Sequence, residues 1–178
     1  MSAGMDFSWE GKGKVLYACI VLFKSHTIAK KLYFYLLQSI YERTLHFRKL
    51  TRKKKKKLLS EIKKLLDSPL SGVSSNDIFV FQLIIERKID IPRKYAWLER
   101  KTAELLLSVR KYRNYPHRVV IGSDLEKGQY SFARRLETTL QGTIDVYVDD
   151  KACEVGIADI LVNYARLTRN LAIKKHHC

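Results

Sequence analysis

The pattern of apolar and polar positions in the first half of the chain predicts two strands and two helices. Residues 14–22 form a nearly uncharged run rich in Val, Ile and Tyr, and residues 78–85 (IFVFQLII) form another. Such runs are typical of strands that are buried on both faces. Helical spacing of the apolar residues predicts one helix over about 27–44 and a second over 51–68, each with a threonine in the capping position.

The second half of the chain alternates between the two patterns. Pro92 stands where a first helical residue belongs, and it opens a helix that runs to about Tyr112. Beyond it we expect a strand over 118–121, a helix over 130–140, a strand over 143–148 and a helix over 155–171. This alternation predicts an α/β structure with parallel pairing, a mixed sheet flanked by helices. We expect one domain over residues 1–178, with a loop-tethered helical insertion near residues 45–75.

The chain carries a large excess of positive charge. It has 34 Lys and Arg against 18 Asp and Glu, a formal net charge of +16, while 46% hydrophobic and 11% aromatic content exclude a wholly disordered chain. Residues 1–75 contribute 16 − 5 = +11 and residues 76–178 contribute 18 − 13 = +5. The excess indicates a polyanionic partner, nucleic acid (RNA or DNA) first and an anionic membrane surface second.

The positive charge is densest at the start of the second predicted helix. Eight cations occupy ten positions there, and five consecutive lysines point to all sides of a helix at the cost of mutual repulsion. We interpret them as contacts to phosphates; the alternatives are a solvated helix end or a localisation signal. Aromatic residues interleave with the cations, which is compatible with base stacking but is also typical of core positions. The cations are Arg48, Lys49, Arg52, Lys53, Lys54, Lys55, Lys56 and Lys57, and the aromatics are Tyr33, Phe34, Tyr35, Tyr41 and Phe47.

Three further features suggest a cytoplasmic protein with no membrane partner. The longest uncharged apolar run, residues 15–23, is nine residues long, against the roughly 18 that a spanning helix needs. Residues 1–9 lack a basic stretch followed by an apolar one, so we expect no signal peptide. Three cysteines, far apart in the sequence, fit neither a zinc site nor a disulfide framework and suggest a reducing compartment.

Acidic residues concentrate near the last predicted strand. Five of them lie within fifteen residues, beside the single cation Lys151. Carboxylates at the end of a strand and on the first turns of the next helix can converge, and magnesium or manganese requires such oxygen ligands. The alternative is that these acids offset neighbouring cations or cap the helix. The five are Asp145, Asp149, Asp150, Glu154 and Asp159.

Asp159 is the most informative member of this group. It lies in a largely apolar helical stretch, where a carboxylate is costly unless it is paired, hydrogen-bonded or bound to metal. Asp124, just after the strand RVVI, occupies a comparable strand-end position. Asp6, which precedes the first strand that the apolar pattern predicts, is expected to join them.

The segment VYVDDKACEVGIADILVNYARLTRN resembles the C-terminal signature of ribonuclease H-like proteins of the family domain of unknown function 3800. Asp149, Asp150 and Lys151 match its Asp-Ser-Lys at a strand end. Residues 156–159 (GIAD) match its Gly-Ile-Gln-Leu-Ala-Asp helix with two residues missing. The order of elements agrees with the family along nearly the whole chain. The resemblance implies a ribonuclease H-like fold with a basic helical hairpin, formed by two antiparallel helices that project the lysine run.

The resemblance also implies a chemistry. Metal-dependent hydrolysis of phosphodiester bonds would use Asp6, Asp124, Asp149 and Asp159, with two cations held by Asp6, Asp149 and Asp159. The chain departs from the family at two places: Phe7 stands where the opening motif of the first strand has Glu, and Gly122 where an Asp is expected. These departures favour the alternative, a non-catalytic nucleic-acid-binding module, such as a component of a ribonucleoprotein particle.

Overall fold

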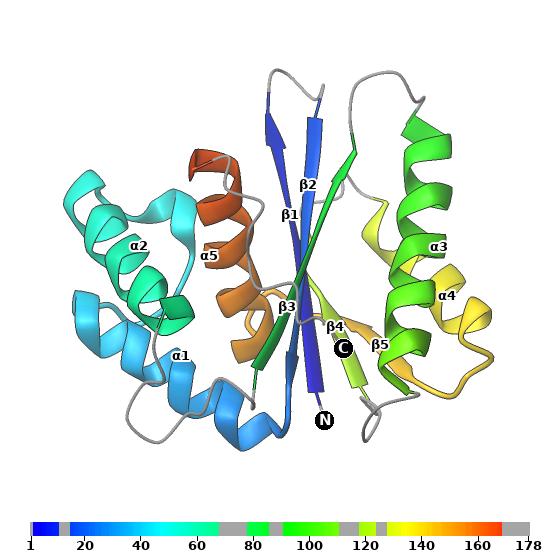
Figure 1. Ribbon diagram of the computed structural model, residues 1–178, viewed down its shortest axis with the longest axis horizontal. Coiled ribbons are helices and arrows are strands. Elements are labelled where there is room, and N and C mark those ends of the chain that lie inside the picture. Colours follow the sequence, from blue (N-terminus) through cyan, green and yellow to red (C-terminus); the bar gives the residue numbers. More distant parts are fainter. Residues whose placement is uncertain are drawn as a thin grey trace.

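The computed structural model describes residues 2–10, 15–67, 78–85, 91–110, 118–123 and 128–168. They form a five-stranded sheet with helices on both faces (Figure 1). The strands are β1 (Ser2–Glu10), β2 (Val15–Phe23), β3 (Ile78–Ile85), β4 (Arg118–Ile121) and β5 (Asp145–Val148). The helices are α1 (His26–Ile40), the 3₁₀ turn η1 (Phe47–Lys49), α2 (Arg52–Asp67), α3 (Ile91–Arg110), α4 (Gln129–Thr139) and α5 (Cys153–Thr168).

The strand order is β3-β2-β1-β4-β5. β2 pairs antiparallel with β1 and β3, whereas β1, β4 and β5 run parallel. The predicted mixed α/β sheet is confirmed, and so are the expected strands over 78–85 and 118–121. Among the described residues, none of the helices is both long enough and apolar enough to cross a membrane.

The first strand is the main correction to the sequence analysis. The apolar pattern placed no strand before residue 14, yet β1 occupies residues 2–10 and lies at the centre of the sheet. Its sequence alternates, with apolar side chains at positions 3, 5, 7 and 9 and small or polar ones at the even positions. Because successive side chains of a strand point to opposite faces, β1 presents one apolar and one polar face. Asp6 therefore lies in the central strand and not before the sheet.

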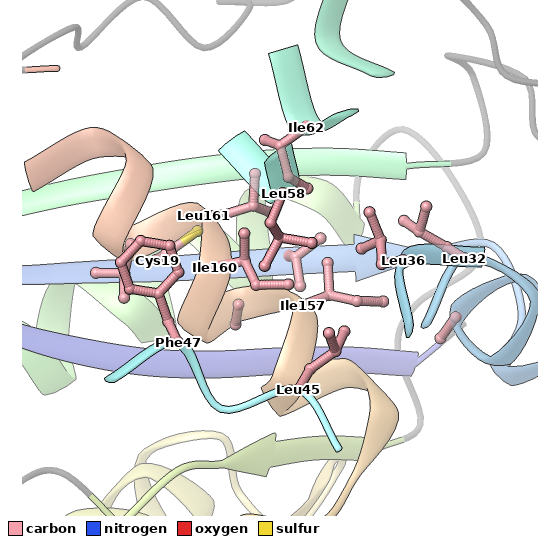
Figure 2. Packing of buried hydrophobic residues seen from close by; sticks show 14 of the residues in the cluster. Cys19, Leu32, Leu36, Leu45, Phe47, Leu58, Ile62, Ile157, Ile160 and Leu161 are labelled. Atoms are coloured by element: carbon pink, nitrogen blue, oxygen red, sulfur yellow. The ribbon is translucent and has the colours of Figure 1, made fainter. Parts of the chain in front are cut away.

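Two hydrophobic cores lie on the two faces of the sheet. On one face, Met5 and Phe7 of β1 pack with α3 and α4; on the other, Cys19 and Val21 of β2 pack with α1, α2 and α5. Figure 2 shows this second core, in which the segment carrying Leu45 and Phe47 closes over α5. Burial of these apolar side chains is the principal term that holds α1 and α2 against the sheet.

The helices α1 and α2 form the expected antiparallel hairpin. Contacts join Glu42, two residues beyond the end of α1, to Lys54, and Tyr35 of α1 to Glu61, so the end of α1 lies near the start of α2. Residue Ser25, not Thr27, caps α1 by accepting a hydrogen bond from the Ile28 amide, and α1 ends at Ile40, earlier than predicted. Thr51 caps α2 as predicted, accepting from the Lys54 amide. Residues 68–75 of the expected insertion lie outside the described residues.

Candidate functional site

Asp6 is a buried carboxylate beside the end of β4. Met5 is paired with Ile121 across the parallel strands, and the Gly122 amide continues the ladder by donating to the Met5 carbonyl at 2.8 Å. A Cβ placed on Gly122 would lie 2.2 Å from Asp6 Oδ1 and 3.1 Å from Val155 Cγ1. Any side chain at position 122 would therefore displace the Asp6 carboxylate. The glycine that the family comparison counted as a departure is what makes room for Asp6.

The charge of Asp6 affects the Cys19 thiol on the neighbouring strand β2. Asp6 is paired with Cys19 across the β1–β2 ladder, and Cys19 is fully buried. Burial, and secondarily the Asp6 carboxylate, raise the pKa of the Cys19 thiol far above its usual range. Cys19 is therefore a neutral core thiol and not a nucleophile.

Phe7 does not face Asp6. Its ring is buried on the α3–α4 side of the sheet, where it meets Phe132 of α4 edge-on, with the ring centroids 5.9 Å apart. Even-numbered residues of β1 face α5 instead: Gly4 lies against Glu154, and Ser8 is hydrogen-bonded to Asn163. A glutamate at position 7 would enter the apolar core rather than join Asp6. The absence of a glutamate at position 7 therefore does not change the surroundings of Asp6.

Asp159 lies on α5 within a buried polar network. Its Oδ2 accepts a hydrogen bond from the Phe47 backbone amide at 2.7 Å, and its Oδ1 accepts from Asn163 Nδ2 at 2.8 Å. The Nδ1 atom of His46 lies 3.6 Å from Asp159 Oδ2. These contacts supply the partners that a carboxylate in an apolar helix requires. They tie the segment between α1 and α2 to α5, and Asp159 thereby has a structural role whatever else it does.

The acidic cluster of the sequence is divided among separate places. Asp149 Oδ1 accepts from the Lys151 amide at 2.9 Å, and Asp150 accepts from the amide and hydroxyl of Ser123. These bonds close the turn between β5 and α5 and attach it to the end of β4. Glu154, wholly buried, lies 2.7 Å from His26 Nδ1. Of the alternatives for these acids, the offsetting of a neighbouring cation is seen at Glu154, whose Oε1 also lies 3.8 Å from an Arg118 nitrogen.

These positions bear directly on the expected magnesium or manganese. Among the His, Cys, Asp and Glu residues that the structure describes, no three form a group that could hold a metal ion. Asp6, Asp149 and Asp159 therefore do not meet as a ligand set, and two oxygens of Asp159 already accept hydrogen bonds. Asp124, the fourth predicted carboxylate, lies outside the described residues. The described carboxylates alone do not fit a metal centre, and we derive no step through one.

The predicted cations form a surface at the start of α2, which we call the basic surface (residues 48–57). Lys54 is paired with Glu42 at 2.6 Å, and Lys55 Nζ donates to the Arg48 carbonyl at 3.3 Å. The other cations of the basic surface are exposed. The first turn of α2 has no acidic residue, so its cations add to the positive end of the helix dipole. Exposed on this surface are Arg48, Lys49, Arg52, Lys53, Lys56 and Lys57.

A hydrogen bond from Tyr35 of α1 to Glu61 of α2 helps to hold the basic surface in place. Tyr35 donates to Glu61 Oε2 at 2.7 Å, and Lys64 donates to Glu61 Oε1 at 2.9 Å. The hydrogen bond from Tyr35, followed by that from Lys64, keeps the pKa of Glu61 below its ordinary value. Leu58 and Ile62 anchor the opposite side of α2 in the core. The run of lysines therefore lies on a helix that is packed against the hydrophobic core.

Two solved structures resemble this chain along most of its length. Ribonuclease HII from Archaeoglobus fulgidus, solved in complex with PCNA, matches 95% of this chain and 73% of its own, with 18% identity and a TM-score of 0.56. The ribonuclease H2 from Pyrococcus horikoshii matches 94% of this chain and 72% of its own, with 16% identity and a TM-score of 0.53. The chain has a ribonuclease H-like fold. At such identity the likeness concerns the fold alone.

The family resemblance has less support than the fold. No family model matches the chain, and no curated protein matches it. Membership of the domain of unknown function 3800 family therefore remains a prediction, whereas the ribonuclease H-like fold that it implied is confirmed. The choice of Asp6 as a site residue stays a prediction, and the contacts of Gly122, Ser8 and Asn163 were missed because the sequence holds no local signal for them.

Proposed function

We propose that this protein binds nucleic acid through the basic surface on α2. The observation that carries the proposal is a set of exposed cations at the positive end of a helix that is itself anchored in the core. Their mutual repulsion and their unfavourable position relative to the helix dipole oppose folding. A bound polyanion offsets both the repulsion among the cations and their unfavourable position at the helix end. Each phosphate contact also releases counterions from the nucleic acid, which adds to the affinity.

The ribonuclease H-like fold supports the same proposal. The solved structures that it resembles are named as a ribonuclease HII and a ribonuclease H2. Fold alone does not define function, so the basic surface carries the argument and the fold adds to it. The proposed ligand is RNA or DNA, which the protein contacts through the phosphates of the ligand. This binding requires no catalytic step.

The test is salt-dependent binding by a variant with Lys49, Lys53 and Lys56 changed to Gln, which leaves Lys57 in place. Each lysine that contacts a phosphate contributes about 0.9 to the slope of log affinity against log salt for duplex DNA and about 0.7 for single strands. We expect the slope to become shallower by about 2.7 for duplex and about 2 for single strands, with weaker binding to all sequences. Filter binding of labelled RNA and DNA at several salt concentrations measures both quantities.

A matched control distinguishes a site from net charge. Changing Arg100, Lys101 and Arg134 to Gln removes the same charge from α3 and α4, across the sheet from α2 (Figure 1). This control is expected to keep nearly the wild-type slope. Equal slopes in both variants, or tighter binding to phosphatidylserine vesicles than to nucleic acid, would contradict the proposal.

Phosphodiester hydrolysis is a second candidate, favoured by one observation. Asp6 is held at the centre of the sheet beside the end of β4, in space that Gly122 leaves open. Asp124 follows Gly122 by two positions. The hydrolysis candidate rests on these two residues.

Cleavage assays separate the two candidates. The hydrolysis candidate predicts that wild-type protein cuts labelled RNA, DNA or hybrid duplex with magnesium or manganese present, and that Asp6→Asn abolishes cutting. Asp149→Asn, at an exposed carboxylate, is the matched control and should still cut. Asp159→Asn is a poor probe, because it leaves a buried donor without an acceptor and costs about 1–3 kcal/mol of stability. Cutting that survives in Asp6→Asn would refute the assignment.

A further inference from the structure

An exposed aromatic ring stands beside the basic surface. Tyr41, the cap residue that follows α1, is 86% exposed, and Lys57 Nζ lies 5.5 Å from the centre of its ring. The ammonium group thus lies over one face of the ring, in the arrangement of a cation–π contact. The high exposure leaves the rest of the ring available to solvent. An aromatic ring backed by a cation, next to further exposed cations, has the composition of a surface that stacks on bases.

The backbone at Tyr41 gives a second, independent reason to assign the ring a role. Tyr41 adopts the left-handed conformation, with φ 55°, where it caps α1 by donating its amide to Gln38. Glycine or asparagine is the usual residue at such a cap, because a bulky side chain is disfavoured there. Neither helix capping nor burial therefore explains a tyrosine at this position.

A second exposed ring lies on α1. Phe34 is 55% exposed and precedes Tyr41 by seven positions. Phe34 also touches the Tyr33 ring edge-on, with the centroids 6.0 Å apart, which limits its movement.

We propose that Tyr41 stacks on an unpaired base, and that single-stranded nucleic acid is the form that the basic surface binds. The inference rests on the proposed function. In a duplex the faces of the bases are covered by their neighbours, so an aromatic ring outside the helix has no base face to meet. Phosphates, in contrast, are available in both forms. The cations of α2 therefore supply affinity for any nucleic acid, and Tyr41 supplies the preference for single strands.

The test uses four labelled probes of about 12 nucleotides: single-stranded DNA, single-stranded RNA, duplex DNA, and a strand of abasic residues. Loss of one stacked base by Tyr41→Ala is expected to weaken binding to the two single strands about 5- to 150-fold. Duplex and abasic binding should stay unchanged, and so should the salt slope, because the tyrosine releases no counterions. Tyr41→Phe keeps the ring and should bind like wild type.

Tyr130→Ala is the matched control, because Tyr130 is another highly exposed tyrosine, on α4 across the sheet (Figure 1). Thermal melting checks that each variant is folded. Tyr41→Ala that binds single strands like wild type, or that loses all four probes equally, would overturn the stacking assignment while leaving the proposed function intact. Wild-type protein that binds none of the probes at low salt would instead overturn the proposed function itself.

Discussion

Replacing Phe7 by glutamate is expected to unfold the protein rather than to restore a carboxylate site. Phe7 is fully buried, and its ring meets Phe132 edge-on in the core between the sheet and α4. Removing such a ring costs about 3–5 kcal/mol, and burying an acid that has no partner adds at least about 2 kcal/mol. The sum is comparable to the whole stability of a typical protein of this size, about 5–15 kcal/mol.

Urea denaturation followed by circular dichroism measures this effect. Phe7→Leu, which keeps most of the apolar volume, is the control and should remain folded with a much smaller loss of stability. A folded Phe7→Glu variant with new cleavage activity would contradict the observed orientation, because it would require residue 7 to share the face of Asp6. The result therefore also tests the register of the central strand.

Gly4→Ala should be the most damaging of the glycine substitutions. A Cβ at Gly4 would lie 2.3 Å from both the carbonyl carbon and the oxygen of Glu154, so α5 itself would have to move away from β1. Forced overpacking of this kind costs about 1–3 kcal/mol, and we expect about 3 kcal/mol because the obstacle is backbone. The free energy of unfolding, from denaturant titration, gives the value.

Two other glycines provide a graded comparison. A Cβ at Gly156 would meet the edge of the Tyr33 ring at 2.6 Å, and a side chain can move more easily than a helix backbone. A Cβ at Gly142 would meet nothing within 4 Å, and only its φ of +64° opposes alanine. We expect the loss of stability to be largest for Gly4, smaller for Gly156, and about 1 kcal/mol for Gly142. A loss at Gly142 equal to that at Gly4 would show that backbone conformation and not close packing governs the effect.

The position of α5 against β1 links these stability effects to the candidate site. Gly4 lets α5 approach the central strand, and Gly122 leaves space for the Asp6 carboxylate beside Val155 of α5. Ser8 and Asn163 join the same two elements farther along. The polar face of β1 is thus a line of small or polar residues along which α5 packs closely.

The sequence by itself determined most of the secondary structure and the distribution of charge. Long periodic or uninterrupted apolar runs specify their elements locally, which is why β3, β4 and α5 lie close to their predicted positions. The same holds for the basic surface, since a run of lysines is a property of the chain before it folds. The capping role of Thr51 could also be predicted from the sequence, because a helix cap forms within one turn.

Only the tertiary structure decided the position of β1 in the sheet and the partners that the acidic residues contact. A central strand is usually apolar on both faces, and β1 alternates because a close-packed helix, not a layer of large side chains, covers its polar face. The acids near β5 are neighbours in sequence but point to different partners, Asp149 to its own turn, Asp150 to Ser123 and Asp159 to Phe47. Asp6 and Gly122, far apart in the chain, meet only because β1 and β4 pair in parallel, and that pairing depends on contacts that no local pattern encodes.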